Sequence, residues 1–153
     1  MAKLTRVGLR GQKLTQADLR AQRKIYALDL REIVKCTRKL EQWTAKQARD
    51  AELWYKNFLW MSYLNGRRPV AVLRPDADKV WHNHILDTSN YHKDCKAIFG
   101  GYLHHQSITG RLTRVHLAAI AATQQSSMEL FSVQMSPYSV FSCSGCAIGK
   151  GSY

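Results

Sequence analysis

The segment from residue 75 to residue 105 constrains the fold most, because it mixes titratable groups with bulky apolar side chains. It holds five of the six histidines, one of the four cysteines and one of the four tryptophans. Burying such polar groups costs free energy unless they are hydrogen-bonded, paired or bound to a metal. The segment therefore predicts either a hydrogen-bonded polar core or a functional site.

The composition indicates one globular domain. The 153 residues are 45% hydrophobic and 10% aromatic, and a chain of this length buries most of its unfolded surface. We expect residues 1–137 to form a single helical domain. Residues 138–153 contain Ser, Gly and Cys with little apolar periodicity, which predicts a flexible, mobile tail.

The apolar periodicity of the first half favours helices. Leucine, isoleucine and tyrosine side chains recur at helical spacing over residues 15–40, which predicts an amphipathic first helix with a basic outer face. A second helix is expected over residues 43–64 and should end at Asn65-Gly66, because both residues tolerate the left-handed conformation. Residues 70–73 are the one candidate for a short extended segment.

The second half predicts two more helices and completes an all-α fold, a compact bundle of about four helices. We expect the histidine-rich motif to lie on one unbroken helix over residues 76–99, which Gly100-Gly101 ends. A fourth helix is predicted over residues 113–133. On this reading the chain reverses after residue 99 and returns alongside the motif helix.

The charge of the chain is strongly positive and unevenly placed. The formal net charge is +12, and residues 1–40 carry 11 Lys/Arg against 3 Asp/Glu. Such an excess attracts anions, so the expected partner, if there is one, is an acidic protein or nucleic acid; a solvated basic surface is the simpler explanation of the charge. The candidate polyanion-binding residues are Arg20, Lys24, Arg31, Lys35, Arg38, Arg67 and Arg68.

Nothing in the sequence has the pattern of a secretory signal or a transmembrane segment. The longest apolar run is LAAIAA at residues 117–122, which is far shorter than the roughly 20 residues that span a bilayer. The four cysteines are too sparse for a disulfide framework. We therefore expect reduced thiols and a cytoplasmic location.

The favoured reading of the histidine-rich segment is a polar core. On an unbroken helix His82 and His84 point about 200° apart and cannot share one ion. His84 can instead bond to the backbone or to Asp87, and Asp78 can pair with His82 one turn away. The predicted polar core motif comprises His82, His84, Asp87, Tyr91 and Cys95.

A metal site is the second reading. His92 and Cys95 lie at i, i+3 on one helix face, and a reversal at the paired glycines can return His104 or His105 beside them. The candidate zinc ligands are thus His92, Cys95, His104 and His105. A second version adds Cys143 and Cys146, whose CxxC spacing also suits zinc. The cofactor is expected to be zinc or none.

Catalysis is the third reading, and the balance is against an enzyme. His84 with Asp87 can form a base and its orienting partner, and Cys95 can serve as a nucleophile. The chain carries none of the sequence motifs of phosphate-binding loops, serine hydrolases or HExxH metalloproteases. These three residues are therefore weak catalytic candidates.

The order of the motif residues resembles a known family. In sequence they are Asp78, Val80, Trp81, His82, His84, Ile85, Leu86, Asp87, Thr88, Tyr91, Asp94, Cys95, Phe99, Gly100, Tyr102, Leu103, His104 and His105. This series is similar to the core motif of the glycine-rich domain-containing protein-like family. The similarity extends over about residues 45–135, and residues 142–151 resemble a short version of that family's tail. The resemblance implies that the motif residues are a family signature.

The sequence as a whole predicts a non-catalytic helical interaction or assembly domain. Its basic face would contact an acidic partner, and its His/Cys/Asp/Tyr motif would fix the fold. Two alternatives remain open: a protein that binds zinc or another metal, with or without enzyme activity, and a protein that binds nucleic acid independently of sequence.

Overall fold

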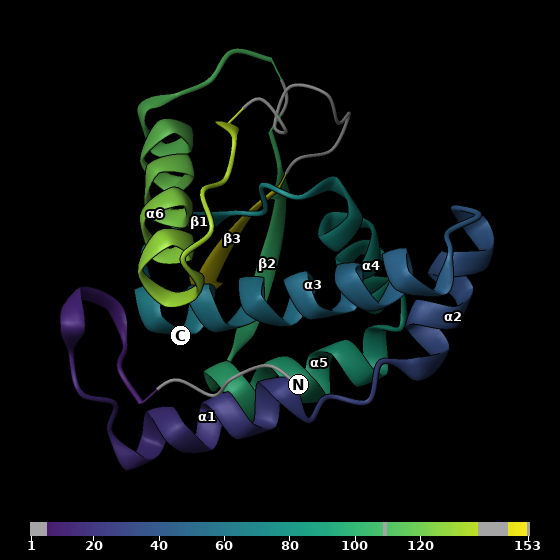
Figure 1. Ribbon diagram of the computed structural model, residues 1–153, viewed down its shortest axis with the longest axis horizontal. Coiled ribbons are helices and arrows are strands. Elements are labelled where there is room, and N and C mark those ends of the chain that lie inside the picture. The colour runs from purple at the N-terminus through teal and green to yellow at the C-terminus, as the bar shows by residue number, and fades with distance from the viewer. Residues whose placement is uncertain (1–5, 109, 138–146, 153) are drawn as a thin grey trace.

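The computed structural model describes residues 6–108, 110–137 and 147–152, and its helices are grouped around the longest one, α3 (Figure 1). In chain order the elements are the 3-10 turn η1 Leu9–Gly11, α1 Gln16–Tyr26, α2 Arg31–Leu40, α3 Ala45–Asn65, β1 Val70–Ala71, α4 Pro75–Leu86, α5 Thr88–Phe99, β2 Tyr102–Ser107, α6 Arg114–Phe131 and β3 Ala147–Ser152. The fold is mostly helical, as predicted, but the described residues form six α-helices where about four were expected.

Helix α3 forms the centre of the molecule and contacts α1, α2, α4 and α6. It begins at a capping box, in which Thr44 and Gln47 each accept a hydrogen bond from the other's backbone N–H group. It ends at Gly66, whose φ of 59° is a left-handed conformation that glycine adopts without strain. The predicted second helix and its Asn65-Gly66 end are thus confirmed.

The predicted first helix is divided into two. Thr15 and Asp18 form the capping box that starts α1, within the range predicted for the first helix. Helix α1 stops at Tyr26, and α2 begins at Arg31 after a short connection. In that connection Asp29 accepts hydrogen bonds from the backbone and the guanidinium of Arg31. This local bonding turns the chain before α2 starts.

The histidine-rich segment is also divided, which corrects the expectation of one unbroken helix over residues 76–99. Asp87, with φ −81° and ψ 66°, lies outside the helical region between α4 and α5. Its N–H group still bonds to the carbonyl of His84 at 3.1 Å, while its own carbonyl accepts from Tyr91 N at 2.9 Å. One residue therefore ends α4 and starts α5, and the two helices follow different directions (Figure 1).

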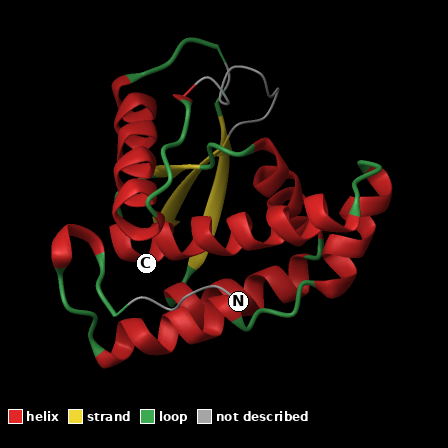
Figure 2. Cartoon of the chain, in the orientation of Figure 1, coloured by secondary structure: helices red, strands yellow, loops and turns green. Residues whose placement is uncertain are grey.

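A small antiparallel sheet lies beside α6, and its strands run across the direction of α3 in the view of Figure 2. Its strand order is β1-β3-β2, so β3 lies between two strands that precede it in the chain. In the register Ala71 faces Ile148 and His105 faces Gly149. The extended segment predicted at residues 70–73 contains β1, whereas β2 was not predicted. Strand β3 occupies residues predicted as a mobile tail, and the remainder of that tail, residues 138–146 and 153, lies outside the described residues.

The main hydrophobic core lies between α3 and the surrounding helices. Its largest fully buried side chains include Tyr55, Phe58 and Trp60 from α3, Trp81 from α4 and Tyr91 from α5. The rings of Phe58 and Trp81 approach to 4.6 Å between centroids, a distance at which aromatic pairs stabilise a core. Within the described chain, none of the helices has the combined length and apolar character that crossing a bilayer requires.

Helix α6 is joined to the sheet by one buried hydroxyl group. The Oγ1 atom of Thr123 accepts a hydrogen bond from Ala71 N at 2.8 Å and lies 2.8 Å from the carbonyl of Ala71. A valine at this position would fill the same space but would leave the buried N–H group of Ala71 without that acceptor. Thr123 thus connects the register of β1 to the position of α6.

We expect Thr123→Val to lower the free energy of unfolding by about 1–3 kcal/mol, because a buried donor loses its partner. Urea denaturation followed by circular dichroism measures this difference. Thr88→Val, at an exposed position at the start of α5, is the matched control and should change stability by no more than about 0.5 kcal/mol. Equal effects of the two substitutions would contradict the role assigned to Thr123.

Candidate metal centre

Helix α4 presents a carboxylate and an imidazole on one face. Asp78 and His82 are four residues apart, so their side chains lie one above the other. The distance between Asp78 Oδ2 and His82 Nε2 is 3.6 Å, which confirms the pairing predicted from the spacing. The Asp78 side chain is only 2% exposed and that of His82 is 44% exposed. The pair therefore extends from the protein interior to the surface.

Strand β2 adds a second imidazole to this face. Side chains alternate between the two faces of a strand, so Leu103 and His105 share one face and His104 lies on the other. Leu103 is fully buried and His104 is exposed. The His105 ring lies 4.5 Å from the Trp81 ring between centroids, which holds it against α4. One turn of helix and one strand thus bring three potential ligands together.

The three side chains meet at one point. His82 Nε2 lies 2.6 Å from His105 Nε2, and His105 Nε2 lies 3.2 Å from Asp78 Oδ1. Tetrahedral zinc with ligands at 2.0–2.1 Å separates its ligand atoms by about 3.3 Å. The distance of 3.2 Å from His105 to Asp78 Oδ1 is close to this value, and that of 3.6 Å from His82 is to the other carboxylate oxygen, Oδ2. The two imidazole nitrogens, 2.6 Å apart, lie closer together than two zinc ligands would. Among the described residues, this is the one set of three or more His, Cys, Asp or Glu side chains whose ligand atoms lie within 4.8 Å of one another.

Burial and one carboxylate act in opposite directions on the charge of the cluster. Burial lowers the pKa of His82; Asp78 opposes this shift by raising it, and His105 adds to it by lowering it. Because a carboxylate only accepts hydrogen bonds, the proton of the neutral pair belongs on His105 Nε2, between Asp78 and His82. A metal ion in place of this proton would have two imidazole lone pairs and one carboxylate directed at it.

The other histidine of α4 belongs to a separate, buried group. His84 Nδ1 lies 2.8 Å from the hydroxyl of Tyr55, and its Nε2 lies 3.1 Å from Asp94 Oδ2. Since the carboxylate only accepts, Nε2 carries the proton and Nδ1 accepts from Tyr55. Burial lowers the pKa of His84, although Asp94 opposes that shift. The break at Asp87 permits this contact, because positions 84 and 94 would lie about 15 Å apart along one helix.

A third polar group holds β2 against the helices. The Nε1 atom of Trp81 donates to the Tyr91 hydroxyl at 2.9 Å, and that hydroxyl donates to the carbonyl of Leu103 at 2.5 Å. Cys95 is buried beside Tyr91, and burial raises the pKa of its thiol. A protonated, buried thiol is a poor nucleophile. Of the five residues predicted as a polar core, His84, Tyr91 and Cys95 are buried, whereas His82 is exposed and Asp87 is half-buried. The polar side chains of this region form three separate hydrogen-bonded groups.

The structure does not gather the residues predicted as zinc ligands. Cys95 faces the core, and His92 lies exposed on α5 with its ring 6.1 Å from that of Tyr102. His104 and His105 point to opposite faces of β2, so only His105 reaches the cluster. The physical reason is that residues 102–107 form a strand, whose side chains alternate between two faces. Cys143 and Cys146 lie outside the described residues.

The weak catalytic candidates are not assembled into a nucleophile–base arrangement. His84 bonds to Asp94 where Asp87 was expected, and Asp87 accepts from the side chain of Asn90 at 2.8 Å. Cys95 is held beside Tyr91. Sequence reasoning missed Tyr55 and Asp94 as partners of His84 and did not count Asp78 as a ligand. The spacing of four residues between Asp78 and His82 could have identified Asp78 as a ligand, because it places both side chains on one face of a helix.

The predicted polyanion-binding residues do not form one continuous stripe. Arg31 pairs with Asp29 at 2.7 Å and Lys35 with Glu32 at 3.6 Å, which partly neutralises the basic face of α2. The Nε atom of Arg38 donates to a backbone carbonyl. By element, the seven residues are divided among α1 (Arg20, Lys24), α2 (Arg31, Lys35, Arg38) and the turn before β1 (Arg67, Arg68).

Two substitutions test the hydrogen bonds of His84. Tyr55→Phe leaves Nδ1 buried without a donor, and we expect the free energy of unfolding to fall by about 1–3 kcal/mol. Asp94→Asn keeps an oxygen that can accept from Nε2 at a partly exposed position, so its loss should be smaller. Urea denaturation of both variants near neutral pH compares them. A larger loss for Asp94→Asn would contradict the proposed tautomer.

Comparison with models of protein families gives a match. The family model described as UCP032817-like matches residues 21–115, a range that runs from α1 to the start of α6. No curated protein and no solved structure matches the chain significantly. The matched range includes Asp78, His82 and His105, together with the buried groups around His84 and Tyr91. The chain therefore belongs to the UCP032817-like family.

Proposed function

We propose that this protein is a metal-binding helical domain that holds one divalent transition-metal ion through Asp78, His82 and His105. The observation that carries the proposal is a buried carboxylate without a permanent positive partner. Asp78 is 2% exposed, and its ion pairs among the described residues are with the two histidines alone. A buried carboxylate is costly unless a cation and hydrogen bonds compensate for the lost water. A bound metal ion would supply that charge at any pH at which the imidazoles are neutral.

The ligand types favour zinc or a similar ion. Two imidazole nitrogens and one carboxylate suit zinc and other first-row transition metals better than calcium or magnesium, which prefer oxygen ligands. Three protein ligands leave a fourth tetrahedral position, as in sites that exchange ligands, whereas structural zinc sites are closed by four. The exposed edge of His82 gives this position access to solvent. The proposal therefore concerns an accessible site and assigns no reaction to it.

Zinc titration tests the site directly. We expect the metal-free protein to bind one zinc ion per chain in isothermal titration calorimetry. With free zinc at a hundredfold excess over Kd, the free energy of unfolding should rise by about 2.7 kcal/mol, because the ion binds the folded state. A chelator should reverse this gain. Absence of zinc binding, or binding without any gain in stability, would contradict the proposal.

Matched histidine variants identify the ligands. His82→Ala and His105→Ala should each weaken zinc binding by at least about 100-fold. Loss of a residue that only hydrogen-bonds to a metal ligand already weakens metal binding by about 10- to 100-fold, and loss of the ligand itself should weaken it more. His104→Ala is the control, because it removes a neighbouring imidazole from the opposite face of β2. It should bind zinc like the unmodified protein. Equal losses in His104→Ala and His105→Ala would instead support the ligand set predicted from the sequence.

The functions predicted from charge remain predictions. An interaction or assembly domain with an acidic partner, and nucleic-acid binding independent of sequence, both rest on the net charge of +12. Binding to nucleic acid would weaken steeply as salt is raised. The resemblance to the glycine-rich domain-containing protein-like family likewise remains a proposal, supported by the order of the motif residues. None of these readings depends on the metal centre.

A further inference from the structure

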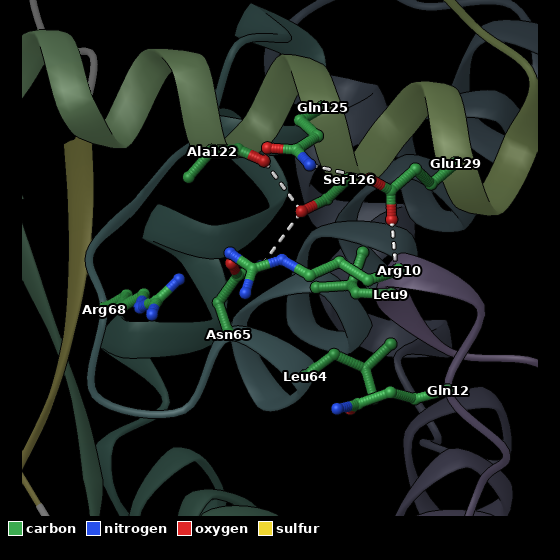
Figure 3. A pocket seen from close by; sticks show the side chains of 10 residues that line it. All are labelled: Leu9, Arg10, Gln12, Leu64, Asn65, Arg68, Ala122, Gln125, Ser126 and Glu129. Atoms are coloured by element: carbon green, nitrogen blue, oxygen red, sulfur yellow. Dashed lines mark hydrogen bonds between the residues drawn. The ribbon is translucent and has the colours of Figure 1, made fainter.

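A polar cavity of about 300 Å³ lies away from the metal centre, between η1, the end of α3 and α6. Leu9 and Leu64 contribute apolar atoms to its wall, and the other lining side chains are mostly polar (Figure 3). Its volume is at the lower end of the range typical of small-molecule sites. The cavity opens to solvent, so a ligand could enter without any movement of the fold.

The charges of this cavity favour an anion. Arg10 and Arg68 line it, and among the described residues neither guanidinium has an ion pair with a carboxylate. The single carboxylate in the lining, Glu129, is already engaged: Oε2 accepts from the backbone N–H of Arg10 at 2.6 Å and Oε1 from Gln125 at 2.8 Å. Glu129 keeps its negative charge and interacts electrostatically with Arg10, but the two arginines still leave the lining with a net positive charge.

The backbone at Arg10 is strained, and the strain places its side chain. Arg10 has φ 57° and ψ 30°, a left-handed conformation that is unfavourable for residues other than glycine. The hydrogen bond to Glu129 holds this conformation. As a result the side chain of Arg10 lies across the cavity towards Asn65, with Arg68 at the far side (Figure 3). Strained residues of this kind cluster at ligand sites.

We propose that this cavity binds a small ligand that carries a phosphate group, held between the guanidinium groups of Arg10 and Arg68. Planar guanidinium groups bind phosphate oxygens through paired, charge-assisted hydrogen bonds. The polar side chains between them would bind the rest of the ligand, and the two leucines would contact its carbon atoms. Free inorganic phosphate and a small phosphate monoester share this chemistry.

Calorimetric titration of the metal-free protein with inorganic phosphate and, separately, with glycerol 3-phosphate tests the proposal. Absence of metal keeps phosphate from binding through Asp78 and the two histidines, so failure here and failure of the metal centre are distinguishable. We expect saturable binding of one phosphate per chain, and tighter binding of the monoester if the cavity also contacts carbon atoms. Equal affinity would assign the site to the free ion, and absence of binding by both would overturn the proposal.

Two variants assign the binding to the cavity. Arg10→Gly keeps the left-handed backbone and its hydrogen bond to Glu129 while removing the guanidinium, so it should not lower the melting temperature. Arg10→Gly and Arg68→Gln should each weaken phosphate binding about tenfold or more, as expected for a lost charge-assisted hydrogen bond. Arg111→Gln removes one exposed positive charge elsewhere and should leave the affinity within about twofold. Equal losses in all three variants would overturn the proposal, because net charge alone would then explain binding.

Discussion

The hydrogen bond from the Tyr91 hydroxyl to the carbonyl of Leu103 is the contact on which the candidate site depends. It joins α5 to β2, and Trp81 on α4 donates to the same hydroxyl. Three elements are therefore held by one buried oxygen atom. Because Leu103 is fixed, His105 two residues later must face α4, where it meets Asp78 and His82. The metal centre is thus positioned by a structural contact that contributes no ligand to it.

Parts of the fold could be predicted from local chemistry. The start of α1 at Thr15 and the end of α3 at Gly66 depend on capping, which acts within a few residues. The breaks after Tyr26 and at Asp87 could not be found in this way, because apolar periodicity continues through both. The structure tolerates the break at Asp87 because it brings His84 to Asp94 and satisfies a buried imidazole. Tertiary contacts there outweigh helix propensity.

The sequence predicts which types of residue form the candidate site, but it does not predict which individual residues belong to it. The i, i+4 spacing identified Asp78 and His82 as neighbours, and the paired glycines indicated that the chain returns near the motif. The choice between His104 and His105 depends on which face of β2 is covered. That face is set by Leu103 and by pairing with β3, a strand some forty residues further along the chain. A local pattern contains no information about such a distant partner.

The position of β3 has a consequence for how the protein is made. It lies between β1 and β2, although residues 147–152 are synthesised after both of them. While the nascent chain emerges from the ribosome, the facing edges of β1 and β2 have no backbone partner until this segment appears. Unpaired strand edges are prone to associate with other chains. These two edges are therefore most open to association in the interval between the emergence of α6 and the pairing of β3.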